Sequence, residues 1–199
     1  MTLADPAVAA DPWAGAAAMR VTEAWHCELK EALDDLCGQR TPSGERPSRF
    51  VVSPQALQEW FRSEYAIEYD FPLSDRRLSH NDLHWSNLTA PSLSILDWEW
   101  LGLLPVGYDA GMLIANSCTS DDLVARLERV FAPHFETATG YAARLFAAHA
   151  VRNGARNEWL DPQLMPHLDT MMARLEGGLR TYTIQNKNFG IDTLRARLA

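Results

Sequence analysis

One short segment constrains this chain more than any other. Residues 80–87 read His-Asn-Asp-Leu-His-Trp-Ser-Asn, and the apolar stretch 94–96 then ends in Asp97, Trp98 and Glu99. Phosphoryl transfer with magnesium uses residues in this order. One Asp orients the attacking hydroxyl and accepts its proton, while a downstream Asn and an Asp at the end of a strand hold the metal ions. Hard oxygen ligands suit Mg²⁺, which keeps several waters and needs few protein groups.

The two segments resemble the aminoglycoside phosphotransferase and choline kinase family of kinase-like enzymes. The catalytic loop of that family typically reads H-G-D-L-H-x-x-N, and its metal-binding strand ends in I-D-W-E. In this chain Asn81 stands in place of the usual Gly, and Gly102, Pro105 and Asp109 follow in the family's order. The match spans about residues 76–115.

The resemblance implies a role for each matched position. Asp82 would be the catalytic base, and Asn87 and Asp97 would bind Mg²⁺ and, with it, the phosphates of ATP or GTP. The supporting residues would be His80, His84, Glu99 and Asp109. Among these, Asp109 would tie its own helix to the catalytic loop.

The coarse pattern predicts a mostly α protein with one small β-hairpin, an α+β fold. Apolar residues recur at helical spacing from Met19, Ser53 and Pro54 form a helix start, and the chain after Pro105 is helical in pattern. Two short apolar stretches around Ala-Pro-Ser predict a hairpin over residues 88–96. We expect a loose N-terminal arm over residues 1–18, and a kinase-like C-terminal lobe over residues 19–199.

The segment before the catalytic loop differs from that of the family. Its 79 residues contain no phosphate-cradling cluster of glycines, and Lys30 is their single lysine. The resemblance therefore extends to the C-terminal lobe and leaves out the N-terminal nucleotide-binding lobe. Without that lobe, the face of the C-terminal lobe that would pack against it is exposed. We expect a protein partner, or a second copy of the chain, to bind at this face.

The composition limits the classes of molecule that the chain is expected to bind. The formal charge is −8 and the pI is near 5.2, so binding to nucleic acid or to an anionic membrane is disfavoured. The expected substrate is a hydroxyl-bearing small molecule or peptide, with a cationic one mildly favoured. Three cysteines without metal-like spacing, and an N-terminus without a secretory pattern, predict a cytoplasmic protein.

Two alternatives remain at this point. The lobe could be catalytically silent and act as a binding or regulatory subunit, as the missing glycine loop suggests. A metal-dependent hydrolase could instead use His80, Asp82 and His84, although a third linked protein ligand for zinc is not evident. The tryptophans near the hairpin, Trp85, Trp98 and Trp100, favour packing over ligand stacking.

Overall fold

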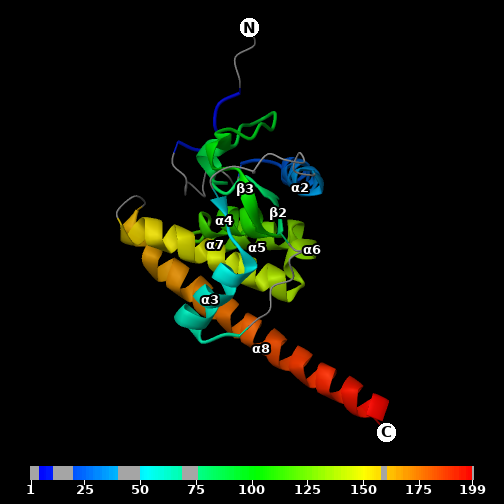
Figure 1. The fold of residues 1–199 in the computed structure, drawn as a ribbon. Coiled ribbons are helices and arrows are strands. Elements are labelled where there is room, and N and C mark those ends of the chain that lie inside the picture. Colours follow the sequence, from blue (N-terminus) through cyan, green and yellow to red (C-terminus); the bar gives the residue numbers. More distant parts are fainter. Residues whose placement is uncertain (1–4, 11–19, 40–49, 69–75, 158–160, 199) are drawn as a thin grey trace.

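The computed structural model describes residues 5–10, 20–39, 50–68, 76–157 and 161–198. Helices dominate this part of the chain, as expected (Figure 1). The elements in chain order are α2 (Glu23–Gly38), β1 (Phe50–Val51), α3 (Pro54–Tyr65), β2 (Arg76–Ser79), η2 (Trp85–Asn87), η3 (Trp98–Trp100), β3 (Gly102–Pro105), α4 (Tyr108–Ala115), α5 (Asp121–Val130), α6 (Ala132–Phe135), α7 (Ala138–Arg156), η4 (Pro162–Leu164) and α8 (Met165–Leu198).

The predicted helix start at Ser53 and Pro54 is confirmed. The Ser53 side chain accepts the backbone N–H of Ala56, and Pro54 occupies the first turn of α3. Ser120 caps α5 in the same way, through the N–H of Leu123. Because these hydroxyls satisfy backbone donors that the helix leaves unpaired, each helix begins where its cap stands.

A three-stranded sheet in the order β1-β3-β2 corrects the predicted strands. β2 pairs with β3 in antiparallel register, Ser79 opposite Gly102 and Arg76 opposite Pro105, while β1 pairs with β3 in parallel. Residues 102–105, for which the sequence pattern predicted no strand, form the central strand. Strands of two to four residues are too short to show a period-2 pattern, so periodicity could not reveal them.

The predicted hairpin over residues 88–96 is present in reduced form. Its strands meet at a single antiparallel bridge between Leu88 and Ile95, and the N–H of Leu96 donates to the carbonyl of Asn87 at 2.8 Å. This contact brings the backbone before Asp97 beside that of Asn87.

Residues 5–10 differ from the loose arm expected for residues 1–18. Ala7 bridges to Thr89, the N–H of Val8 donates to the Leu88 carbonyl at 2.7 Å, and Ala9 is buried. These six residues therefore lie along the hairpin as an added strand-like segment. The rest of the expected arm, and its expected boundary with the lobe at residue 18, lie outside the described residues.

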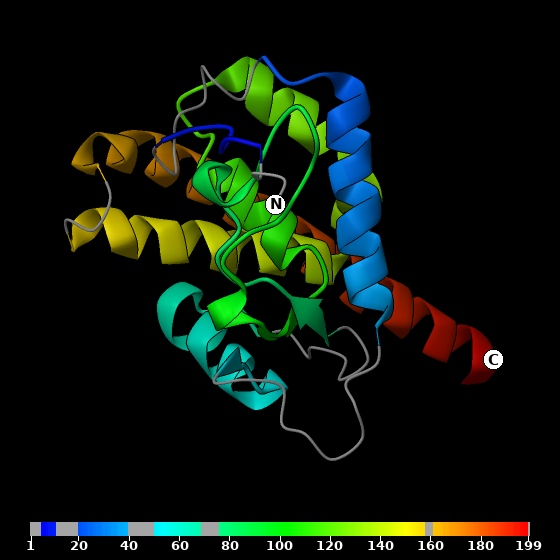
Figure 2. The ribbon, with the colours of Figure 1, turned by 90° about the horizontal axis from the view of Figure 1, so that it is seen from above.

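The core lies between α4, α7 and α8, with α2 and α5 closing it (Figure 2). α4 is buried along its whole length, and Gly111 lets it approach α7, because a Cβ there would stand 3.1 Å from the Cβ of Ala147. α8 packs along α7, and its C-terminal end extends past the other elements (Figure 1). Among the described residues, no helix combines the length and apolarity needed to cross a membrane.

Candidate active site

The loop at residues 80–87 connects the end of β2 to the hairpin. Hydrogen bonds to the first turn of α4 hold it in place. The Asp109 carboxylate, in the first turn of α4, accepts the backbone N–H of His80 at 2.7 Å and that of Asn81 at 2.9 Å. These two bonds connect the first turn of α4 to the loop. Burial raises the pKa of the Asp109 carboxyl, while these two N–H groups and the Ser79 side chain favour its ionised form.

Asn81 adopts a backbone conformation that glycine adopts more readily than other residues. Its φ is +72°, in the left-handed region where Asn is better tolerated than most other side chains.

His80 is a structural residue of the loop. Its side chain is fully buried, Nε2 lies 2.7 Å from the Leu96 carbonyl oxygen, and Nδ1 accepts the backbone N–H of Asp82 at 3.3 Å. Both ring nitrogens are thus engaged in holding the loop to the hairpin. Among the described residues, no group of three or more His, Cys, Asp or Glu is placed to hold a metal.

Asp82, His84 and Asn87 come together in one cluster. Nε2 of His84 lies 3.5 Å from Oδ2 of Asp82 and 3.2 Å from Nδ2 of Asn87, and Nδ2 also donates to the Asp82 carbonyl at 3.0 Å. Neutral His84 with a free lone pair on Nε2 accepts from Asn87, whereas protonated His84 donates to Asp82. Ser86 fixes the ring from the other side, with its hydroxyl 2.9 Å from Nδ1.

The Asp82 carboxyl has a lowered pKa. The hydrogen bond from His84 is the largest cause and outweighs partial burial, which acts in the opposite direction. Asp82 is therefore ionised at neutral pH, as a proton acceptor must be.

Asp97 stands at the far end of the hairpin with its side chain exposed. Its φ is +59°, a left-handed conformation that is uncommon outside glycine and recurs at functional sites. No hydrogen bond or ion pair links its side chain to Asp82, His84 or Asn87 in the described part of the chain. The structure thus brings three of the expected site residues together and leaves Asp97 joined to them through the backbone alone.

The donor atoms fit a magnesium ion chemically. Nδ2 of Asn87 is committed to the Asp82 carbonyl, so its amide oxygen is the atom left for a ligand. The Asp97 side chain makes no capping hydrogen bond, which leaves its carboxylate oxygens available. Oxygen donors of these two kinds are those that Mg²⁺ prefers.

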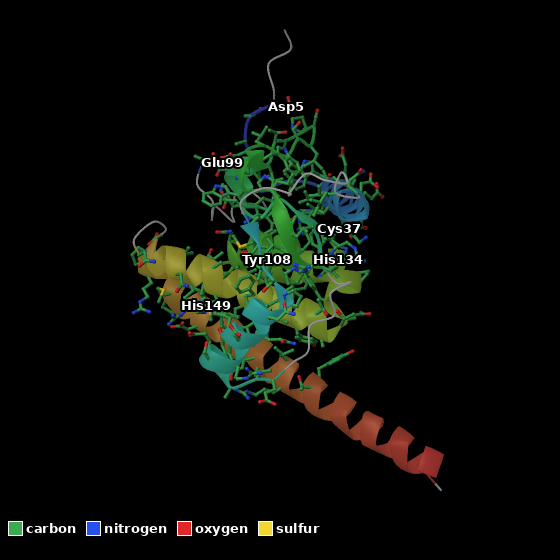
Figure 3. The ribbon with its side chains drawn as sticks, viewed as in Figure 1. Asp5, Cys37, Glu99, Tyr108, His134 and His149 are labelled. Atoms are coloured by element: carbon green, nitrogen blue, oxygen red, sulfur yellow. The ribbon has the colours of Figure 1, made fainter. Side chains whose placement is uncertain are left out.

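Glu99, Trp85 and Trp98 are not part of the cluster formed by Asp82, His84 and Asn87. Glu99 is exposed, above and apart from Tyr108 in the view of Figure 3. Trp85 is fully buried and stacks on Trp25, with ring centroids 6.3 Å apart, so the packing interpretation is confirmed for Trp85. Trp98 is 41% exposed and contacts the His80 ring edge-on at 4.8 Å.

A cavity of about 410 Å³ opens beside the cluster. Its polar side is formed by Asn81, Asp82 and His84. The other lining residues come from the segment after the hairpin, α4 and its C-cap, and α7, and are Trp100, Tyr108, Met112, Asn116, Ala150, Val151 and Gly154. Sequence reasoning missed this wall, because no motif marks it. A faint signal exists: Ala150 and Gly154 are small residues four positions apart, on one face of α7.

The fold and the cavity define a mostly helical α+β protein with an ionisable carboxyl residue, Asp82, among the lining residues of a mostly apolar cavity. No protein-family model matches the chain, and no curated protein does. Among solved structures, the chain is similar to choline kinase from Cryptosporidium parvum, with 12% sequence identity and a TM-score of 0.34. The superposition covers 89% of this chain and 54% of that kinase, so the chain spans about half of its length. This likeness is distant, and the function proposed below rests on the site instead.

Proposed function

We propose that this chain is a phosphotransferase that moves the γ-phosphate of a nucleoside triphosphate to a hydroxyl group of a small molecule or peptide. The observation that carries the proposal is the position of Asp82. Asp82 is one of the lining residues of the 410 Å³ cavity, together with its neighbour His84 and with apolar residues of α4 and α7. A cavity with one ionised carboxylate at its polar side suits an alcohol whose reactive hydroxyl meets that carboxylate.

Asp82 would act as the general base. It accepts the proton of the acceptor hydroxyl as the hydroxyl oxygen attacks the γ-phosphorus, and the bond from phosphorus to the β-phosphate oxygen breaks. The products are the phosphorylated alcohol and a nucleoside diphosphate. His80 and Asp109 hold the loop that carries Asp82, so they position the base without touching the substrate.

Asn87 and Asp97 would hold Mg²⁺ through the amide oxygen and the carboxylate. A bound magnesium ion supplies neutralisation of the phosphate charge that develops during transfer. Asn87 has a second task in this scheme, because Nδ2 donates to the Asp82 carbonyl and so links the metal ligand to the base.

The nucleotide site would be completed by a partner chain. Three large apolar side chains next to Asp97 are exposed: Leu96 at 37%, Trp98 at 41% and Trp100 at 39%. Clusters of exposed aromatic residues are typical of binding surfaces. They lie in the same segment as Asp97, where the phosphates would bind.

The test is phosphate transfer from radiolabelled ATP, with Mg²⁺, to a mixture of small alcohols. We expect Asp82→Asn to lower the rate by about 10²–10⁴-fold while leaving nucleotide affinity unchanged, since the general base is lost and the metal ligands remain. Asp97→Ala is expected to weaken the binding of Mg²⁺ and ATP in calorimetry. Asp35→Asn, an exposed carboxylate on α2, is the matched control for charge removal.

Three outcomes separate the possibilities. Transfer by Asp82→Asn at the wild-type rate would refute the role of Asp82. Nucleotide binding that depends on Asp97, with no transfer by the wild-type chain, would favour the catalytically silent alternative. No nucleotide binding by the wild-type chain, alone or with a partner, would refute the proposal.

A further inference from the structure

A segment that the proposed mechanism does not use lies along the first strand of the hairpin (Figure 1). The N–H of Val8 donates to the Leu88 carbonyl at 2.7 Å, and the N–H of Ala90 donates to the Pro6 carbonyl at 3.2 Å. These two bonds flank an antiparallel bridge, so the segment pairs with the hairpin as a further strand does.

The opposite edge of the same strand pairs with the second strand of the hairpin. The N–H of Leu96 donates to the Asn87 carbonyl at 2.8 Å, and the N–H of Thr89 donates to the Ser94 carbonyl at 3.1 Å. Backbone groups of a strand point alternately to its two sides, which explains why successive residues bond to different neighbours. Residues 87–90 are therefore the central strand of three.

The added strand stabilises a hairpin that would be weak without it. Two short strands are marginally stable in isolation, and these two meet at one bridge, between Leu88 and Ile95. The segment is itself attached to the core, because Val8 packs against it and Ala9 is buried. At the tip of the hairpin, the Asp5 carboxylate accepts the N–H of the residue after Pro91 at 3.0 Å. The segment thus ties the hairpin to the core along its length.

The two ends of the hairpin carry the residues to which the proposed function assigns Mg²⁺. Asn87 begins the central strand, and Asp97 directly follows Leu96, the residue bonded to the Asn87 carbonyl. Their side chains make no hydrogen bond to each other in the described part of the chain, so the backbone of the hairpin alone sets their separation. Mg²⁺ requires near-ideal octahedral geometry, and a displacement of about 1 Å can cost about 10²-fold in rate.

We propose that residues 5–8 are a positioning segment, which holds the central strand of the hairpin and thereby sets the separation of Asn87 and Asp97. The segment contributes no metal ligand and no catalytic group; it acts through the hairpin. The metal part of this inference rests on the proposed function. The coupling of the segment to the two ends of the hairpin does not, and it is measurable without a metal.

The first test is amide hydrogen exchange of the full chain, followed by NMR without metal. Val8→Pro removes the N–H that donates to the Leu88 carbonyl, and proline is tolerated on an edge strand. We expect exchange at Leu96, whose N–H lies across the central strand from the segment, to become about 3- to 10-fold faster, the value of one neutral hydrogen bond. Exchange at Ala147, in the buried middle of α7, should not change, which separates a local effect from a loss of overall stability.

The neighbouring residue provides the matched control. Ala7 is bridged to Thr89 between the two hydrogen bonds, in the type of pair whose own N–H groups point away from each other. Ala7→Pro therefore removes no bond to the hairpin, and exchange at Leu96 should stay at the wild-type rate.

A side-chain variant keeps the test sound if Val8→Pro disturbs folding. Asp5→Ala removes the acceptor of the Ser92 N–H at the tip of the hairpin, whereas Asp5→Asn keeps an acceptor oxygen in the same place. We expect Asp5→Ala to speed exchange at Ser92 about 3- to 10-fold, and Asp5→Asn to restore most of the protection.

The second test is metal binding, with Mn²⁺ as a paramagnetic probe for the Mg²⁺ site. We expect Val8→Pro to weaken Mn²⁺ binding about 3- to 10-fold, and to leave the transfer rate at saturating metal within about twofold of the wild type, because the base at Asp82 is untouched. A variant that is simply less folded would lose rate at saturation as well.

The outcomes separate this inference from the proposed function. Unchanged exchange at Leu96 in Val8→Pro, or an equal effect of Ala7→Pro, would overturn the coupling of the segment to the hairpin. Faster exchange with unchanged Mn²⁺ affinity would overturn the positioning of the metal residues. A wild-type chain that binds no Mn²⁺ would contradict the metal roles of Asn87 and Asp97 in the proposed function, while the exchange rates would still decide whether the segment holds the hairpin.

Discussion

The carboxylate of Asp109 accepts the backbone N–H of His80 at 2.7 Å, a buried contact between residues 29 positions apart. It joins the first turn of α4 to the loop that carries Asp82, and the second carboxylate oxygen does the same for Asn81. The position of the proposed base is thus set by a helix that contributes no catalytic group of its own.

Loss of this carboxylate should loosen the loop and destabilise the fold. Asp109→Ala leaves two backbone N–H groups without their acceptor, and at about 1–3 kcal/mol for each we expect a loss of about 2–6 kcal/mol in the free energy of unfolding. Urea unfolding followed by circular dichroism measures it. Asp35→Ala, on the exposed face of α2, should change stability by less than about 0.5 kcal/mol. A loss at Asp109 no larger than that of the control would contradict the assigned role.

The pair between Asp34 and His134 should make stability fall in acid. Burial alone would raise the pKa of the Asp34 carboxyl, but hydrogen bonds from Lys30 and His134, at 2.5 and 2.6 Å, lower it below 3.8. The stabilisation is therefore complete above the unfolded pKa and is lost as pH falls through the lower folded value.

We accordingly expect Asp34→Asn to be less stable than the wild type near about pH 6, and the difference to shrink as the pH falls below about 4. Because the Asp34 side chain is 41% exposed, solvent screens the pair, and the difference should stay below about 1 kcal/mol. Thermal unfolding at a series of pH values measures it. A difference that grows in acid would have the wrong sign and exclude this explanation.

Two glycines should respond in opposite ways to alanine. A Cβ at Gly140, in the first turn of α7, would stand 2.7 Å from the Cα of Phe135, so Gly140→Ala forces α6 and α7 apart. A Cβ at Gly177 on α8 meets nothing within 4 Å, so Gly177→Ala should stabilise the helix by roughly 0.5–1 kcal/mol. Chemical unfolding measures the free energy of unfolding of both variants. Stabilisation by Gly140→Ala would contradict the close approach of α6 to Gly140.

The three thiols should differ in reactivity. Cys27 is exposed, whereas burial raises the pKa of Cys37 to about 11 and that of Cys118 to about 11. Since the thiolate is the reactive form, we expect one fast thiol in the native protein at about pH 8, and two more after unfolding. Cys27→Ser should remove the fast phase. Two or three fast-reacting thiols in the native protein would refute the prediction that Cys27 is the most reactive of the three.

The local features of the fold were predictable from residues alone. Ser53 and Ser120 mark helix starts because a hydroxyl before the first turn satisfies backbone donors without tertiary help. The pattern of residues 80–87 indicated where the chemistry would lie, because each residue type in it has a specific use in phosphate transfer. The roles of Asp82, Asn87 and Asp97 stay predictions, while the grouping of Asp82 with Asn87 is now an observed contact through His84.

What the sequence determined by itself was therefore local: helix starts, amphipathic faces, and a polar segment too specific to be an ordinary turn. The tertiary structure alone decided the short sheet, the seating of residues 5–10 on the hairpin, and the cavity wall at Asn116. Strands of two to four residues carry no readable period, and a cavity exists only between elements. Asn116 and Ala150 share a wall because α4 packs on α7, and no spacing along the chain records that distance.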